Sequence, residues 1–215
     1  MIVPQYYPIY VDLEDQHVLV IGGGSIACRK VQTLLEYGAR VTIVSPDLNP
    51  ELIEIVRSKQ CQWLQKEYSQ GDIGDAILIY SCTDQEKVNA QVSEDAKADL
   101  RLINVVDDPA KCSFIVPSIF KRGDLSIAVS TGGSSPMVAR KIRADLEAQY
   151  GEETERYLAL LKSWRSEIKS SPLSTEEKMR FWEKVTDGEV LDLIKNNQDE
   201  KAKGMIQKCF QSLLV

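Results

Sequence analysis

A glycine-rich stretch near the N-terminus has the spacing of a dinucleotide-binding turn. Gly22, Gly24 and Ala27 match the pattern G-x-G-x-x-A, directly after the apolar run His17–Gly22. A glycine at the second position leaves room for a pyrophosphate, which lies against the positive N-terminus of the following helix. The spacing therefore predicts a nucleotide site. The alternative interpretation is a tight strand-to-helix turn without a ligand.

The residues expected to contact the rest of the cofactor favour NAD. An acidic side chain usually ends the second strand of an NAD-binding fold, but Ser45, Pro46 and Asp47 stand there, and no basic residue is present to hold a 2′-phosphate. Asp47 is equally compatible with an ordinary turn. The candidate cofactor contacts come from the glycine-rich turn and from the ends of two later strands: Gly22, Gly23, Gly24, Ser25, Ile26, Ser45, Asp47 and Thr83.

Two adjacent carboxylates, Asp107 and Asp108, follow the apolar run over 101–106. Ligands bind at the carboxyl ends of the strands in open α/β sheets, so a carboxylate there is a candidate general base. Repulsion between the two charges would raise the pKa of one of them. The sequence Asp-Asp-Pro is also a common turn, and the residues alone leave both interpretations open.

A second glycine-rich segment, residues 130–136, precedes a basic stretch and suits an anionic ligand. A helix start capped by Ser135 and Pro136, followed by a solvated basic face, is the structural alternative. The candidate substrate contacts are two cations at an expected hairpin turn, the loop residues, and two cations of the expected helix: Lys121, Arg122, Thr131, Gly132, Gly133, Ser134, Arg140 and Lys141.

The composition disfavours several other classes of protein. His17 is the one histidine and the five cysteines show no C-x-x-C spacing, so we expect no resident metal and no disulfide framework. A net charge of −6 disfavours nucleic-acid and anionic-membrane binding. No apolar run approaches the roughly 18 residues of a membrane span. We expect a soluble, cytoplasmic protein.

The elements that must position these residues follow from hydrophobic periodicity. Apolar runs predict buried strands over 17–22, 40–45, 76–81 and 101–106, with strand-like runs over 114–116 and 125–130. Helical stretches alternate with the first four strands, and the pattern after Pro136 is helical. The sequence therefore predicts an α/β fold: a Rossmann-type parallel sheet domain over 1–113, a small central segment over 114–150, and a C-terminal helical domain over 151–215.

Five segments in this order resemble the precorrin-2 dehydrogenases, a family that includes the N-terminal module of siroheme synthase. The matching segments are PIYVDL at 8–13, GGGSIACRK at 22–30, NVVD at 104–107, SFIVP at 113–117 and STGGSSP at 130–136. The resemblance implies NAD-dependent oxidation of precorrin-2 to sirohydrochlorin in siroheme biosynthesis, with Asp107 as the catalytic aspartate.

The resemblance also has implications for assembly and for a second activity. It implies a homodimer in which the central segment and the C-terminal helices form the subunit contact. Some family members also insert Fe²⁺, an accessory sirohydrochlorin ferrochelatase activity that we expect to be weak or absent here. The alternative from another functional class is a non-catalytic, NAD-sensing regulatory domain.

Overall fold

The computed structural model describes residues 5–214, which form two compact units on either side of the boundary between Val116 and Pro117. The strands of the first unit are β1 (His17–Ile21), β2 (Arg40–Val44), β3 (Gln62–Leu64), β4 (Leu78–Ser81) and β5 (Leu102–Val105). Its helices are α1 (Ser25–Glu36), α2 (Pro50–Arg57) and α3 (Glu86–Ala98), with short 3₁₀ turns at Gln70–Asp72 and Pro109–Lys111.

The five strands of the first unit form one parallel sheet in the order β3-β2-β1-β4-β5. Alternate residues of β1 enter different cores: Val18 and Val20 pack with α1 and α2, whereas Leu19 and Ile21 pack with α3. The sheet is therefore covered on both faces, which confirms the predicted Rossmann-type architecture. The strand order reverses beside β1, and this is where ligands bind in such sheets.

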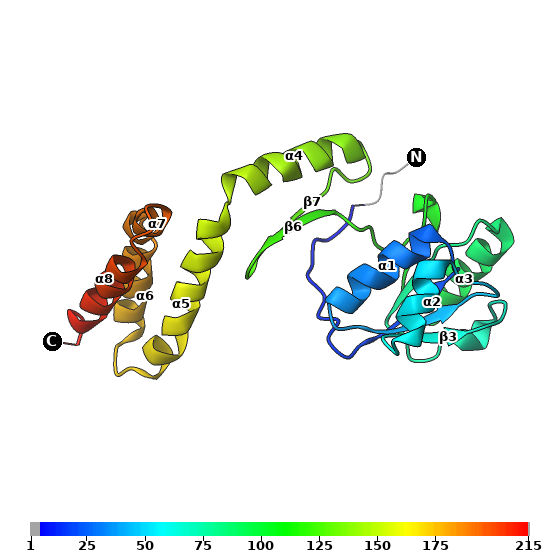
Figure 1. Cartoon of the computed structure of the whole chain (residues 1–215), viewed down its shortest axis with the longest axis horizontal. Helices are drawn as coiled ribbons and strands as arrows, with labels where there is room; N and C mark the ends of the chain where they lie inside the picture. Colours follow the sequence, from blue (N-terminus) through cyan, green and yellow to red (C-terminus); the bar gives the residue numbers. More distant parts are fainter. Residues whose placement is uncertain (1–4, 215) are drawn as a thin grey trace. The chain divides into compact units, whose positions relative to one another are not determined.

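The second unit begins with an antiparallel hairpin of β6 (Ser118–Arg122) and β7 (Leu125–Val129), against which α4 (Pro136–Gln149) packs. Four further helices follow, namely α5 (Glu152–Ser170), α6 (Thr175–Val185), α7 (Glu189–Lys195) and α8 (Asp199–Gln211) (Figure 1). Phe181 is fully buried among these four helices, and its ring packs close to those of Trp164 and Phe210. The predicted helical character of this part of the chain is confirmed.

The predicted strands differ from the structure in two details. The run Phe114–Val116 is not a strand: the Phe114 carbonyl oxygen accepts from the Asn104 side chain, at 3.0 Å from Nδ2, and not from a main-chain amide of β5. The three-residue strand β3 was not predicted, because three residues are too short to show a period. The predicted hairpin is confirmed, with Lys121 and Arg122 as the last two residues of β6 and Gly123, at φ +54°, in the turn that follows them.

Within residues 5–214, no helix combines the length and the apolar composition that crossing a membrane requires.

Candidate functional site

The first two glycines of the glycine-rich turn are required by the packing of the protein itself. Gly22 has φ +109°, and a Cβ added there would lie 2.6 Å from the Cys82 carbonyl oxygen. A Cβ at Gly23 would lie 1.9 Å from the Asp47 carbonyl oxygen. A side chain at Gly22 would therefore displace the segment that follows β4, and a side chain at Gly23 would displace the segment that follows β2.

Gly24 differs from its neighbours, because a Cβ added there would meet no protein atom within 4 Å. Gly24 is the N-cap residue of α1, which begins without a side-chain capping bond and without an acidic residue in its first turn. The positive end of the helix therefore borders open space, and its amides are placed to receive an anion. The turn fits a dinucleotide pyrophosphate.

A cavity of about 640 Å³ lies over this turn and brings most of the predicted cofactor contacts together. Seven of the eight predicted residues line it, the exception being Asp47. The lining also includes residues that sequence reasoning missed, from the loop after β3 and from α3; they are Glu67, Tyr68, Val88 and Gln91. No motif marks them, since the fold of the loop and the packing of α3 bring them to the cavity.

The end of β2 presents no carboxylate to the cavity. Ser45 is 7% exposed, and its hydroxyl donates to the Asp47 carbonyl oxygen at 2.7 Å. This bond holds the turn that Gly23 packs against. The main-chain carbonyl of Asp47 therefore stabilises this turn.

Asp107 and Asp108 have different surroundings. Asp107 lines the cavity and makes no hydrogen bond or ion pair with any residue that the structure describes. Asp108 forms an ion pair with Lys111, and the hydrogen bond from Lys111 holds the pKa of the Asp108 carboxyl below its ordinary value. Asp107 also has φ +61°, a conformation that costs energy for a residue other than glycine and is common at functional sites. Asp107 is thus the free carboxylate of the pair.

Buried side chains fix the segment after β4, which forms another wall of the cavity. Ser81 Oγ donates to Asn89 Oδ1 at 2.7 Å, and Asn89 Nδ2 donates to the Thr83 carbonyl oxygen at 3.0 Å. Burial raises the pKa of the neighbouring Cys82 thiol to about 12, so this thiol stays protonated at neutral pH. Cys82 is therefore a wall residue and not a nucleophile.

All of the predicted substrate contacts lie in the second unit. Lys121 and Arg122 belong to β6, Arg140 and Lys141 to α4, and the loop residues 131–134 connect β7 to α4. Arg122 Nε donates to the Tyr150 carbonyl oxygen at 3.3 Å, whereas the exposed Lys141 side chain has no hydrogen bond or ion pair with the described residues.

The loop between β7 and α4 owes its shape to two glycines and a threonine. Gly132 and Gly133 have φ values of +60° and +89°, and a Cβ at either would meet no atom within 4 Å. Thr131 Oγ1 accepts from the Ser135 amide at 3.1 Å and donates to the Ser135 carbonyl oxygen at 3.0 Å. Ser135 caps α4 through the Val138 amide, as predicted. The glycines therefore provide backbone freedom and open space on the same loop.

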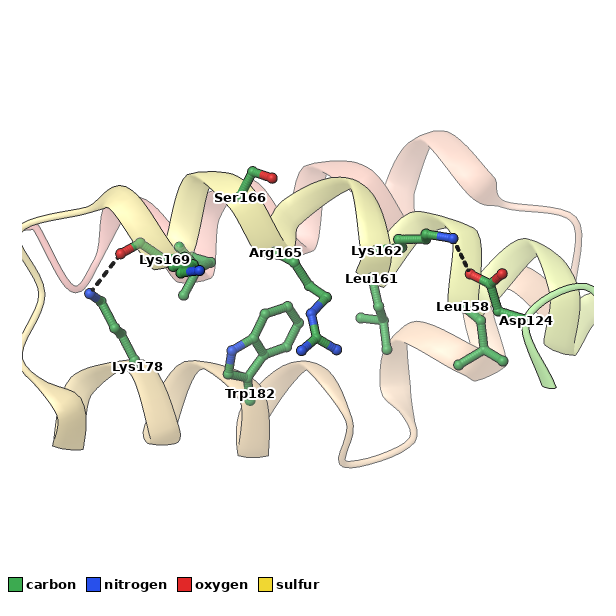
Figure 2. Close-up of a pocket in the computed structure, with 10 residues that line it drawn as sticks. Asp124, Leu158, Leu161, Lys162, Arg165, Ser166, Lys169, Lys178 and Trp182 are labelled. Atoms are coloured by element: carbon green, nitrogen blue, oxygen red, sulfur yellow. Dashed lines mark hydrogen bonds and ion pairs between the residues drawn. The ribbon is translucent and has the colours of Figure 1, made fainter. Parts of the chain in front are cut away.

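A separate groove of about 930 Å³ in the second unit is lined by none of the predicted substrate contacts. Figure 2 shows Arg165 of α5 and Trp182 of α6 facing the same space between the two helices. Lys162 Nζ pairs with Asp124 Oδ2 at 2.8 Å at one end, and Lys178 Nζ donates to the Lys169 carbonyl oxygen at 3.2 Å at the other (Figure 2).

Comparison with protein families gives one model that covers half of the chain. Residues 9–118 match the model described as "Putative NAD(P)-binding". The chain belongs to this NAD(P)-binding family. Residues 122–149 match the model "Sirohaem biosynthesis protein central", and residues 153–210 match "Sirohaem synthase dimerisation region". The family resemblance predicted from the sequence is confirmed.

Individual relatives agree with the family models. The siroheme synthase of Mannheimia succiniciproducens is 40% identical over 198 residues, which is 92% of this chain and 42% of that protein. The siroheme synthase of Neisseria meningitidis serogroup C is 37% identical over 203 residues, 94% of this chain and 42% of that protein. The chain thus spans about two fifths of the length of these curated relatives.

A solved structure matches over nearly the whole chain. The protein titled "SirC, precorrin-2 dehydrogenase" is 28% identical, with a TM-score of 0.78, and the match covers 94% of this chain and 100% of that one. The similarity therefore includes both units of the chain.

Proposed function

We propose that this chain oxidises precorrin-2 to sirohydrochlorin with NAD⁺ as the hydride acceptor, as a step of siroheme biosynthesis. The observation that carries the proposal is one cavity that holds both the open turn at Gly24 and the free carboxylate of Asp107. The similarity to a precorrin-2 dehydrogenase and to siroheme synthases supports the choice of substrate.

The glycine-rich turn and the two neighbouring strand ends bind the cofactor. The amides at the start of α1 receive the pyrophosphate over Gly24, and Ser45 and Thr83 form walls of the same cavity. When bound, NAD⁺ takes up two electrons and one hydrogen as hydride. The residues of this chain hold the cofactor in place.

Asp107 accepts the proton that accompanies this oxidation. Removal of a hydride and a proton from the tetrapyrrole balances the reaction, with the hydride passing to NAD⁺ and the proton to the Asp107 carboxylate. Asp108 is already paired with Lys111 and holds the turn that presents Asp107. A carboxylate without an ion-pair partner is the better proton acceptor of the two.

The second unit binds the carboxylates of the substrate. Charge-assisted hydrogen bonds from cations are the strong contacts available to a polycarboxylate. We assign this task to Lys121, Arg122, Arg140 and Lys141, together with the amides of residues 131–134. The chain acts as a homodimer, for which the match to a dimerisation region over residues 153–210 is the support. The division into segments 1–113, 114–150 and 151–215 belongs to the same proposal.

The proposal is tested by absorbance spectroscopy of the purified chain mixed with precorrin-2, with and without NAD⁺. We expect sirohydrochlorin to form only when both the chain and NAD⁺ are present. A chain that binds NAD⁺ but never turns over precorrin-2 would contradict the proposal and favour a regulatory NAD-binding module.

A second absorbance assay, with sirohydrochlorin and Fe²⁺ as the reactants, addresses metal insertion. Among residues 5–214, no group of three or more His, Cys, Asp or Glu side chains is placed to hold a metal ion. Insertion of Fe²⁺ would then depend on the tetrapyrrole nitrogens as ligands and on a carboxylate as base. We expect sirohydrochlorin and Fe²⁺ incubated with the chain to form siroheme little faster than without it. A rate well above that control would contradict this expectation.

A further inference from the structure

A carboxylate borders the cofactor cavity at a place that no sequence motif marks. Glu67 lies in the loop after β3 and lines the cavity beside Tyr68. Its neighbour Lys66 is engaged with Asp72, with a distance of 2.6 Å between Nζ and Oδ1. Glu67 makes no hydrogen bond or ion pair with any residue in the described part of the chain. The cavity edge therefore carries an uncompensated negative charge.

The strand end that usually supplies such a charge lacks one. In NAD-binding folds an acidic residue at the end of the second strand binds the adenosine ribose. Here Ser45 is buried with its hydroxyl bonded to a main-chain oxygen, and Asp47 does not line the cavity. A residue of this chain that binds the adenosine ribose therefore has to come from another element.

The topology places Glu67 on the adenosine half of the cavity. The pyrophosphate belongs over α1, beside the central strand β1, and Asp107 follows β5 on one side of it. The adenosine half then extends toward β2 and β3 on the other side. The other acidic lining residues, Asp84 and Asp107, follow β4 and β5. Glu67 is thus the acidic lining residue on the β2–β3 side, within the part of the chain that the structure describes.

The loop that carries Glu67 is anchored to the first unit. The hydroxyl of the next residue, Tyr68, donates to Asp95 Oδ2 on α3 at 3.0 Å. Burial and this hydrogen bond raise the pKa of the Tyr68 hydroxyl, so it remains a donor over the physiological range. The hydrogen bond anchors the loop to α3 at the residue next to Glu67, whose own side chain is exposed.

We propose that Glu67 determines the choice between NAD⁺ and NADP⁺. Its carboxylate accepts hydrogen bonds from the adenosine ribose hydroxyls of NAD⁺ and repels the 2′-phosphate of NADP⁺. The inference rests on the proposed function, because it requires a dinucleotide on the glycine-rich turn. It adds a specificity residue on a loop that the G-x-G-x-x-A motif does not reach.

The test is calorimetric titration of the intact chain with NAD⁺, NADP⁺ and ADP-ribose. Glu67→Gln keeps the shape but removes the charge, so NAD⁺ affinity should fall roughly tenfold, the effect of losing a charged hydrogen bond. ADP-ribose affinity should fall by the same factor, because this ligand retains the adenosine half. Glu67→Arg should bind NADP⁺ more tightly than NAD⁺.

The matched control is Glu94, an exposed glutamate of α3 that does not line the cavity and makes no ion pair with the described residues. Glu94→Gln and Glu94→Arg change the net charge by the same amounts and should leave both affinities unchanged. The inference is overturned if Glu67→Arg keeps the wild-type ratio of NADP⁺ to NAD⁺ affinity, or if Glu94→Arg changes that ratio equally. Wild-type chain that binds neither dinucleotide would overturn the proposed function and this inference with it.

Discussion

The two units of the chain present their candidate functional residues in different ways. In the first unit the backbone shapes the site: Gly22 and Gly23 pack directly against carbonyl oxygens, and Asp107 is held at a positive φ. In the second unit the candidates are exposed cations such as Arg140 and Lys141, and loop glycines with open space around them. A site shaped by the backbone should fail abruptly when atoms are added, whereas exposed cations should contribute in small, salt-dependent steps.

The largest effect that we expect is the loss of cofactor binding in Gly24→Asp. The new side chain meets no protein atom, so the fold should survive, but the carboxylate occupies the space of the pyrophosphate and repels it. NAD⁺ binding should become undetectable by calorimetry. Gly71→Asp is the control, because a side chain there also meets no protein atom and φ is not positive. Unchanged NAD⁺ affinity in folded Gly24→Asp would show that the turn carries no cofactor.

A smaller effect is expected in the second unit, from the double substitution Arg140→Ala and Lys141→Ala. The KM for precorrin-2 should rise roughly tenfold at low ionic strength, as for two exposed charge contacts, and the effect should shrink as salt is added. NAD⁺ affinity should stay the same. Lys195→Ala with Lys201→Ala removes the same charge from α7 and α8 of this unit, and should leave KM unchanged.

The oligomeric state of both double variants is to be measured by light scattering, because α4 belongs to the proposed dimer segment. If the dimeric Arg140/Lys141 double variant keeps the wild-type KM at low salt, these two residues do not bind the substrate and are ordinary solvated surface residues.

The smallest effect concerns the stability of the second unit and its pH dependence. Glu177 accepts a hydrogen bond from the Ser174 amide at 2.8 Å, which holds the pKa of its carboxyl below the ordinary value. A lowered folded-state pKa means that the stabilisation is present above the unfolded-state pKa and is lost as the pH falls through the folded-state value. Glu177→Gln should therefore lower Tm slightly at pH 7, and the difference should disappear at acidic pH.

Glu176→Gln is the control for this helix start, since Glu176 takes no part in the cap. A difference between Glu177→Gln and wild type that persists unchanged into acid would contradict the assignment of the lowered pKa to the cap.

The elements of the chain also differ in how well their positions can be predicted from the sequence. The strand β1 was predictable, because a buried parallel strand has a continuous apolar sequence. The glycine-rich turn was predictable as well, because Gly22 and Gly23 pack closely against main-chain oxygens and Gly24 leaves room for a pyrophosphate. Glu67 was not predictable, because it lies in a loop without hydrophobic periodicity. It reaches the cavity only through the packing of β3 and α3. The ion pair of Asp108 with Lys111 has i, i+3 spacing and was a signal available in the sequence.

The central claim is that a dinucleotide turn and the Asp107 carboxylate act in one cavity. Single-turnover oxidation of precorrin-2 at saturating NAD⁺ tests it most directly, with Asp107→Asn and Asp108→Asn compared in parallel. Asp107→Asn should slow the reaction on the order of 10²–10⁴-fold with NAD⁺ affinity preserved, the usual range for a general base. Asp108→Asn, which removes the carboxylate already held by Lys111, should slow it far less. A near wild-type rate in Asp107→Asn, or an equal loss in Asp108→Asn, would contradict the account.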